Sequence, residues 1–227
     1  MRIGYESRVP TLPAGGTVPR MAAEFIIIFF VLVGLFAVVD IPGGPIPVLL
    51  LLTVAVAFYF RRASGFDRRD LWRASALRPA LPSVLGLWAV AAVVAVGAVW
   101  AFDREHFFDL PRHNPGLWAL IVIAYPVLSV YPQELLFRAF LLHRYAPLLR
   151  SPLLGAGASA VAFGFAHILF GNVLAVALTL VGGWLFARRY QQTRSLFVAC
   201  VEHALYGLLI FTVGLGRYFY HGTQFGS

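Results

Sequence analysis

Apolar residues fill most of this chain in stretches long enough to cross a bilayer, and short polar or proline-glycine segments separate them. A transmembrane helix needs about 20 mostly apolar residues, and about seven stretches approach that length. They cover about residues 25–39, 46–60, 81–102, 116–142, 152–170, 172–187 and 195–215. The pattern therefore predicts an all-α fold, a polytopic transmembrane helix bundle with about seven spans.

The segments outside these stretches predict little further structure. Residues 1–23 are expected to be a polar, cytoplasmic leader whose first twenty residues lack regular structure, followed by an uncleaved first span. The connection 61–80 carries six arginines and is typical of an amphipathic segment at the membrane interface. In the fourth span, Pro126 and Pro132 predict a kinked or broken helix that restarts near Pro132. With no repeat and no long linker, residues 1–227 are expected to form a single membrane domain.

Composition agrees with the membrane interpretation. Hydrophobic residues make up 60% of the chain and charged residues 12%, against roughly 25% charged residues in soluble domains. This excludes a soluble enzyme, a disulfide-stapled secreted domain and a disordered tail. All 18 basic residues are arginines, and their position between spans favours anionic headgroups over nucleic acid as their partners.

The distribution of arginines predicts the orientation in the cell membrane. With a cytoplasmic N-terminus, the connections on the inside hold fourteen arginines and those on the outside hold three. Because basic residues are enriched on the cytoplasmic side, we expect the N-terminus inside and the C-terminus outside.

Polar side chains inside the apolar stretches are the candidates for chemistry, since a charge at membrane depth costs at least ~2.5 kcal/mol. Three spans carry them: Gln133, Glu134 and Arg138 in the fourth, His167 in the fifth, and Glu202 and His203 in the seventh. Glu134 and Arg138 are four residues apart, so they share one helix face and can pair. Two histidines and a carboxylate on three helices predict a site that binds a metal ion or activates a water molecule.

Together these segments resemble the CAAX protease and bacteriocin-processing enzyme (CPBP, Abi-type) family of intramembrane proteases, which includes the type II CAAX prenyl endopeptidase. The family pattern is Glu-Glu-x-x-x-Arg on one span, Phe-x-x-x-His on the next, and His-x-x-x-Asn or Asp on a later one. The corresponding segments here are Gln133-Glu134-Leu-Leu-Phe-Arg138, Phe163-Gly-Phe-Ala-His167 and His203-Ala-Leu-Tyr-Gly207, within a core of about residues 117–215. The resemblance implies an endopeptidase that hydrolyses peptide bonds of peptide or protein substrates at the membrane.

The resemblance also implies roles for the matching residues. His167 and His203 would bind a divalent metal such as zinc or stabilise the oxyanion, and Arg138 would order the carboxylate pair. The first glutamate of the family, whose carboxylate activates the water, is Gln133 here, and an amide is no base. The expected asparagine or aspartate is Gly207, which has no side chain.

These departures leave three interpretations open. In the first, the role of the base has moved to Glu134, or to Glu202 beside His203, and the protein is an active protease. In the second, the chain is a non-catalytic membrane scaffold of the same fold. In the third, it is a proton-coupled transporter in which Glu134, His167 and Glu202 relay protons. A transporter is expected to show symmetry between its halves, and the sequence shows no repeat.

Overall fold

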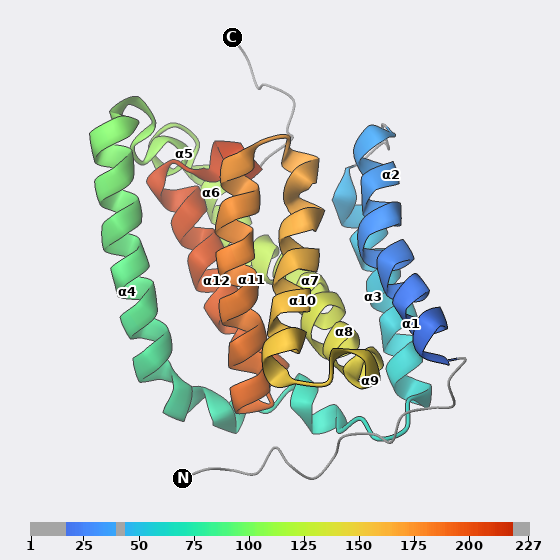
Figure 1. The fold of residues 1–227 in the computed structure, drawn as a ribbon. Helices are drawn as coiled ribbons and strands as arrows, with labels where there is room; N and C mark the ends of the chain where they lie inside the picture. Colours follow the sequence, from blue (N-terminus) through green and yellow to red (C-terminus); the bar gives the residue numbers. More distant parts are fainter. Residues whose placement is uncertain (1–16, 40–43, 220–227) are drawn as a thin grey trace.

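The computed structural model describes residues 17–39 and 44–219, and within these ranges the chain contains helices and no strands (Figure 1). Seven helices there are long and apolar enough to cross a membrane: Thr17–Val38, Pro45–Arg62, Ala74–Phe102, Pro115–Arg144, Pro152–Phe170, Val173–Thr193 and Leu196–Val213. The predicted all-α fold with seven spans is thereby confirmed, and the protein is a multi-pass membrane protein. Its orientation in the membrane stays a prediction.

Several spans consist of more than one α-helical element joined end to end. The α-helices are α1 (Thr17–Ile26), α2 (Leu32–Val38), α3 (Pro45–Arg62), α4 (Leu77–Phe102), α5 (Asp109–His113), α6 (Pro115–Tyr125), α7 (Tyr131–Glu134), α8 (Leu141–Arg144), α9 (Ala146–Leu149), α10 (Pro152–Ala166), α11 (Val173–Thr193) and α12 (Leu196–Val213). Wider π-helical turns over Ile27–Val31, Pro126–Val130 and Leu135–Phe140 join α1 to α2, α6 to α7 and α7 to α8.

The first span begins earlier than its apolar stretch. We expected residues 1–20 to lack structure, and this prediction is wrong for residues 17–20, which belong to α1, while residues 1–16 lie outside the described ranges. The helix is held at its polar end by Glu24, whose carboxylate accepts hydrogen bonds from Arg144 at 2.7 and 3.0 Å and from Tyr145 at 3.0 Å. A pattern of apolar residues does not contain this long-range contact.

The fourth span is continuous over Pro115–Arg144, so of the two predicted forms the broken helix is excluded, while the α-helix restarts at Tyr131, next to Pro132, as expected. Its two internal prolines cannot donate the usual backbone hydrogen bond, and the π-helical turn Pro126–Val130 lies between the helical segments at this point. A second π-helical turn, Leu135–Phe140, follows Glu134 directly and contains Arg138. Such turns occur often at functional sites.

The connection 61–80 forms two short 3₁₀ turns, Arg68–Leu71 and Ala74–Ala76, before α4 begins. Asp70 anchors it: this carboxylate is 1% exposed, and its two oxygens lie 2.6 Å from Arg73 and from Arg194. Burial raises the pKa of the Asp70 carboxyl, although Arg194 and Arg73 oppose that shift. The pairs tie the connection to the loop between α11 and α12.

The spans form a bundle in which α10, α11 and α12 lie between α4 on one side and α1 and α2 on the other (Figure 1). Helices α10 and α11 approach closely at Gly183, where an added Cβ would lie 3.0 Å from Ala160 Cα. A core rich in aromatic rings fills the space between these helices and the fourth span, and it includes Phe137, Phe163 and Phe186. This packing places the polar side chains of the fourth, fifth and seventh spans in one buried region.

Candidate active site

A carboxylate–imidazole pair forms the centre of this region. Glu134, at the end of α7, accepts a hydrogen bond of 2.8 Å at Oε1 from Nδ1 of His203 on α12. The Glu134 residue is 0% exposed and His203 is 6% exposed. Since the carboxylate only accepts, Nδ1 of His203 carries the hydrogen, and Nε2 of the neutral ring is left as an acceptor.

Tyr125 contacts the opposite edge of the His203 imidazole. Its hydroxyl lies 3.2 Å from Nε2 of His203 and donates to it. Tyr125, which lies nine residues before Glu134 at the end of α6, was not among the candidate residues predicted from the sequence. The only sequence signal was indirect, because Gly207 lies one helical turn after His203 and leaves room on the same face.

The space at Gly207 is filled by Tyr125. A Cβ added at Gly207 would lie 2.3 Å from the Tyr125 hydroxyl oxygen and 2.4 Å from Cε1 of its ring. A side chain at position 207 and this position of the Tyr125 ring therefore exclude one another. The phenol stands where the resemblance places an asparagine or aspartate side chain.

Arg138 supports Glu134 from the following turn. Its Nε lies 3.2 Å from Oε2 of Glu134, and both side chains are 0% exposed, so the predicted pairing is confirmed. The guanidinium lies over the ring of Phe163, 4.3 Å from its centre, and 5.5 Å from the centre of the Phe186 ring. The electron-rich faces of these two rings thus stabilise the buried guanidinium cation.

His167 reaches the same cluster from the end of α10. Its Nδ1 donates a hydrogen bond of 2.7 Å to the carbonyl of Phe163, which leaves Nε2 as an acceptor. The Phe163 ring centre lies 4.6 Å from that of His167 and 5.5 Å from that of His203. The Phe163 ring therefore contacts both imidazoles, that of His167 on its own span and that of His203 on the seventh span.

Gln133 and Glu202 lie outside this network of hydrogen bonds. The amide of Gln133 donates to Ser129 Oγ at 2.7 Å, one turn earlier on the same helix. The carboxylate of Glu202 is bound at both oxygens by Arg189, at 2.8 and 3.1 Å, and Arg189 also donates to Ser83 on α4 at 2.8 Å. Because neighbours on a helix point about 100° apart, Glu202 and His203 face different sides of α12.

The donor set does not fit the zinc ion that the resemblance implies. Across residues 17–39 and 44–219, no three His, Cys, Asp or Glu side chains are placed together to hold a metal ion. Both ring nitrogens of His203 contact protein groups, and Nδ1 of His167 is bonded to a carbonyl. Zinc binding stays a prediction that this arrangement does not support, and no chemical step below uses a metal.

Comparison with known proteins identifies one family. Residues 115–209 match the family model described as Type II CAAX prenyl endopeptidase Rce1-like. The searches of curated proteins and of solved structures gave no significant match. The matched range begins with α6 and ends within α12, so it contains the three motifs and also Tyr125.

Proposed function

Because residues 115–209 form a domain of the Rce1-like type II CAAX prenyl endopeptidase family, we propose that the protein is an intramembrane endopeptidase for membrane-associated peptides or proteins. The observation that carries the proposal is the buried chain of hydrogen bonds from Glu134 through His203 to Tyr125. Hydrolysis of a peptide bond needs a base for the proton of water and a donor for the oxyanion. In this hydrogen-bonded network, His203 paired with Glu134 can serve as the base, and the Tyr125 hydroxyl can serve as the donor.

Glu134 acts through His203 in this proposal. Nε2 of His203 takes a proton from water as the water oxygen bonds to the carbonyl carbon, and the Glu134 carboxylate stabilises the imidazolium that results. When the C–N bond breaks, the same Nε2 returns the proton to the leaving amine. Arg138 keeps the second oxygen of Glu134 in place. The imidazole thereby supplies the base that the amide of Gln133 cannot.

Two further side chains, Tyr125 and His167, form hydrogen bonds to the reacting atoms in this proposal. The Tyr125 hydroxyl, which donates to Nε2 of His203, donates instead to the carbonyl oxygen as negative charge develops on it. Nε2 of His167 accepts the second hydrogen of the attacking water and so orients it. Glu202 has a structural role, since its carboxylate is neutralised by Arg189.

One observation favours a second candidate, the non-catalytic scaffold. The Tyr125 ring fills the space beside Gly207 and covers the acceptor nitrogen of His203. A substrate can reach this nitrogen only when the phenol moves. If it does not move, the same network stabilises the bundle without catalysis.

A survey of new peptide termini in cell membranes tests the proposal. It compares the wild type with a deletion strain, and with Glu134→Gln and His203→Gln at matched expression. The control is His113→Gln, which replaces an exposed histidine at the end of α5, outside the three motifs. We expect termini that depend on the protein in the wild type and in His113→Gln, and their loss in the other two variants.

The outcomes separate the alternatives. Glu202→Gln is a further arm of the survey, compared at equal amounts of folded protein. Termini that persist in Glu134→Gln and vanish in Glu202→Gln would assign the base to Glu202 and overturn the proposed role of Glu134. Identical termini in the wild type and the deletion strain, with a phenotype that Glu134→Gln rescues, would establish the scaffold.

A further inference from the structure

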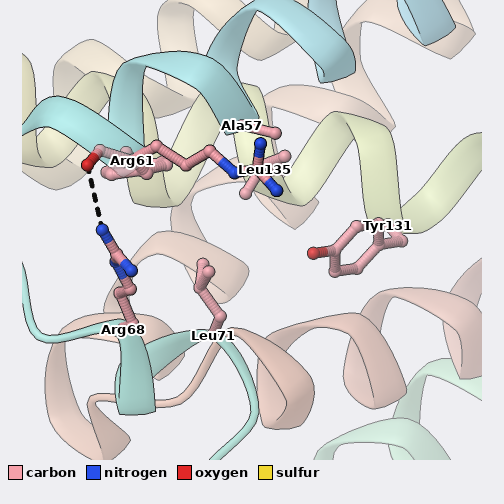
Figure 2. A pocket seen from close by; sticks show the side chains of 7 residues that line it. Ala57, Arg61, Arg68, Leu71, Tyr131 and Leu135 are labelled. Carbon is pink, nitrogen blue, oxygen red and sulfur yellow. Dashed lines mark hydrogen bonds between the residues drawn. The ribbon is translucent and has the colours of Figure 1, made fainter.

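A cavity of about 210 Å³ lies near the end of α3, and none of Glu134, His203 and Tyr125 lines it (Figure 2). Its walls come from α3, from the 3₁₀ turn Arg68–Leu71, and from α7 with the π-helical turn that follows it. Tyr131 and Leu135 contribute the last of these walls. They flank Glu134, so an occupant of the cavity touches the helix that carries the carboxylate that positions His203.

Two arginines make the cavity positive. Arg61 and Arg68 both line it, and none of its lining residues is acidic. Arg68 donates to the backbone carbonyl of Arg61 at 3.0 Å, which holds it at the rim. Figure 2 shows the Arg61 guanidinium and the Tyr131 hydroxyl directed toward the same space. An anionic oxygen placed there would accept hydrogen bonds from both.

Nearby carboxylates do not neutralise this charge. Asp70 is bound to Arg73 and Arg194. Asp67 lies 3.6 Å from Arg73 and accepts a hydrogen bond from the backbone N–H of Arg69. Each acid in the connection is thus engaged with other groups, and the two arginines of the cavity keep their charge for a ligand.

An apolar stripe on α3 leads from the bundle surface to the cavity. Leu51, Val54 and Phe58 are 71%, 54% and 53% exposed, and they follow one another at spacings of three and four residues toward Arg61. Residues at these spacings share a helix face. In a helix that crosses the membrane, this face contacts acyl chains, and it ends at the arginines. A ligand that suits both parts has an anionic head and apolar chains.

We propose that this cavity binds the phosphate of an anionic phospholipid. The phosphate oxygens accept hydrogen bonds from Arg61 and Tyr131, Arg68 adds charge at the rim, and the acyl chains lie along the exposed face of α3. The lipid thereby contacts the segment Tyr131–Leu135 and fixes the position of the helix on which Glu134 lies.

Lipid retention by the purified full-length protein tests this site without any assay of proteolysis. The protein is exchanged into mixed vesicles of phosphatidylglycerol and phosphatidylcholine, and the lipids that it retains are counted by native mass spectrometry. We expect preferential retention of phosphatidylglycerol, reduced about fivefold in Arg61→Gln, since one arginine near an anionic surface contributes about that much. Tyr131→Phe, which removes only a hydroxyl, is expected to reduce it about threefold.

Arg62→Gln is the matched control, because it removes the same charge from the neighbouring residue, which does not line the cavity. We expect its retention of phosphatidylglycerol to equal that of the wild type. Equal losses in Arg61→Gln and Arg62→Gln, or equal retention of the two lipids by the wild type, would overturn the site.

A carboxylate ligand is the competing possibility. Displacement of the lipid by a short peptide with a free C-terminal carboxylate, but not by its amidated form, would make the cavity a peptide site and refute the proposal. If Arg61→Gln does not fold, Tyr131→Phe carries the test, and wild-type retention in that variant refutes the proposed contact.

Discussion

The fit between Gly207 and Tyr125 gives a prediction that depends on a single methyl group. In Gly207→Ala, the new Cβ would lie 2.3 to 2.5 Å from three atoms of Tyr125, about 1 Å inside the 3.4 Å at which ordinary contact begins. The backbone of α12 and the ring cannot both keep their positions. The Tyr125 ring must therefore move, and its 3.2 Å hydrogen bond to His203 is lost.

The expected cost follows from these two effects. Overpacking of a well-filled core costs about 1–3 kcal/mol, and loss of one buried hydrogen bond costs about 0.5–1.5 kcal/mol. Replacing a helical glycine by alanine returns about 1 kcal/mol. Gly207→Ala should therefore lower the free energy of unfolding by about 1–3 kcal/mol. The control is Gly97→Ala on α4, where, apart from the adjoining residues and backbone of the same helix, no atom of the described residues lies within 4 Å of the added Cβ, so we expect no loss of stability.

A double-mutant cycle in detergent, read by reversible denaturant titration, isolates the contact. In a Tyr125→Ala background the atoms that collide with the new Cβ are absent, so Gly207→Ala should cost nothing or stabilise the protein. The coupling free energy between the two changes should exceed about 1 kcal/mol, as for other residues in direct contact. If Gly207→Ala has the same effect in both backgrounds, or behaves like Gly97→Ala in the wild type, the proposed packing is wrong.

Two further predictions concern the ion pair of α12 and the topology. Glu202→Gln or Arg189→Gln alone should destabilise the protein by about 3–5 kcal/mol, because the remaining charge is buried without a partner. Thermal unfolding of the double variant should recover part of that loss, and no recovery would contradict the structural role of the pair. In a Cys200→Ala background, a membrane-impermeant maleimide added to intact cells should label His113→Cys and spare Ser64→Cys. The reverse pattern would invert the predicted orientation.

The fold was predictable because its main signal is local. Seven apolar stretches separated by polar segments specify seven spans without any knowledge of how the spans pack. The ends of the spans were harder to predict from the sequence, since they depend on tertiary contacts. Helix α1 extends to Thr17 through a mixed segment that includes Arg20 and Glu24, and Glu24 is held by Arg144 and Tyr145, far along the chain. No hydropathy pattern includes that interaction.

The candidate site was predictable in part for a similar reason. Glu134 and Arg138 pair because of their spacing on one helix, which the sequence states directly. The bond between Glu134 and His203 joins two spans, and two signals suggested that they meet: polar residues inside otherwise apolar spans, and the resemblance to a family. Tyr125 was missed because tyrosine in an apolar span is ordinary, and its partner is 78 residues away. Glu202 was considered as a base because it directly precedes His203, and its contact with Arg189 joins two helices in a way that no spacing in the sequence indicates.

The two departures from the family motifs can be understood together through His203. A glycine at position 207 admits the Tyr125 ring, and the ring brings a hydroxyl to Nε2 of His203. On the opposite edge of the ring, Glu134 accepts from Nδ1, so the imidazole is fixed in the tautomer that leaves Nε2 as an acceptor. In the proposed mechanism, the imidazole held in this way takes the proton from water, so a second carboxylate at position 133 is not needed. On that proposal, Gln133 and Gly207 belong to a single rearrangement around one histidine, in which the imidazole has the role of the missing carboxylate and the phenol stands in place of the missing asparagine or aspartate.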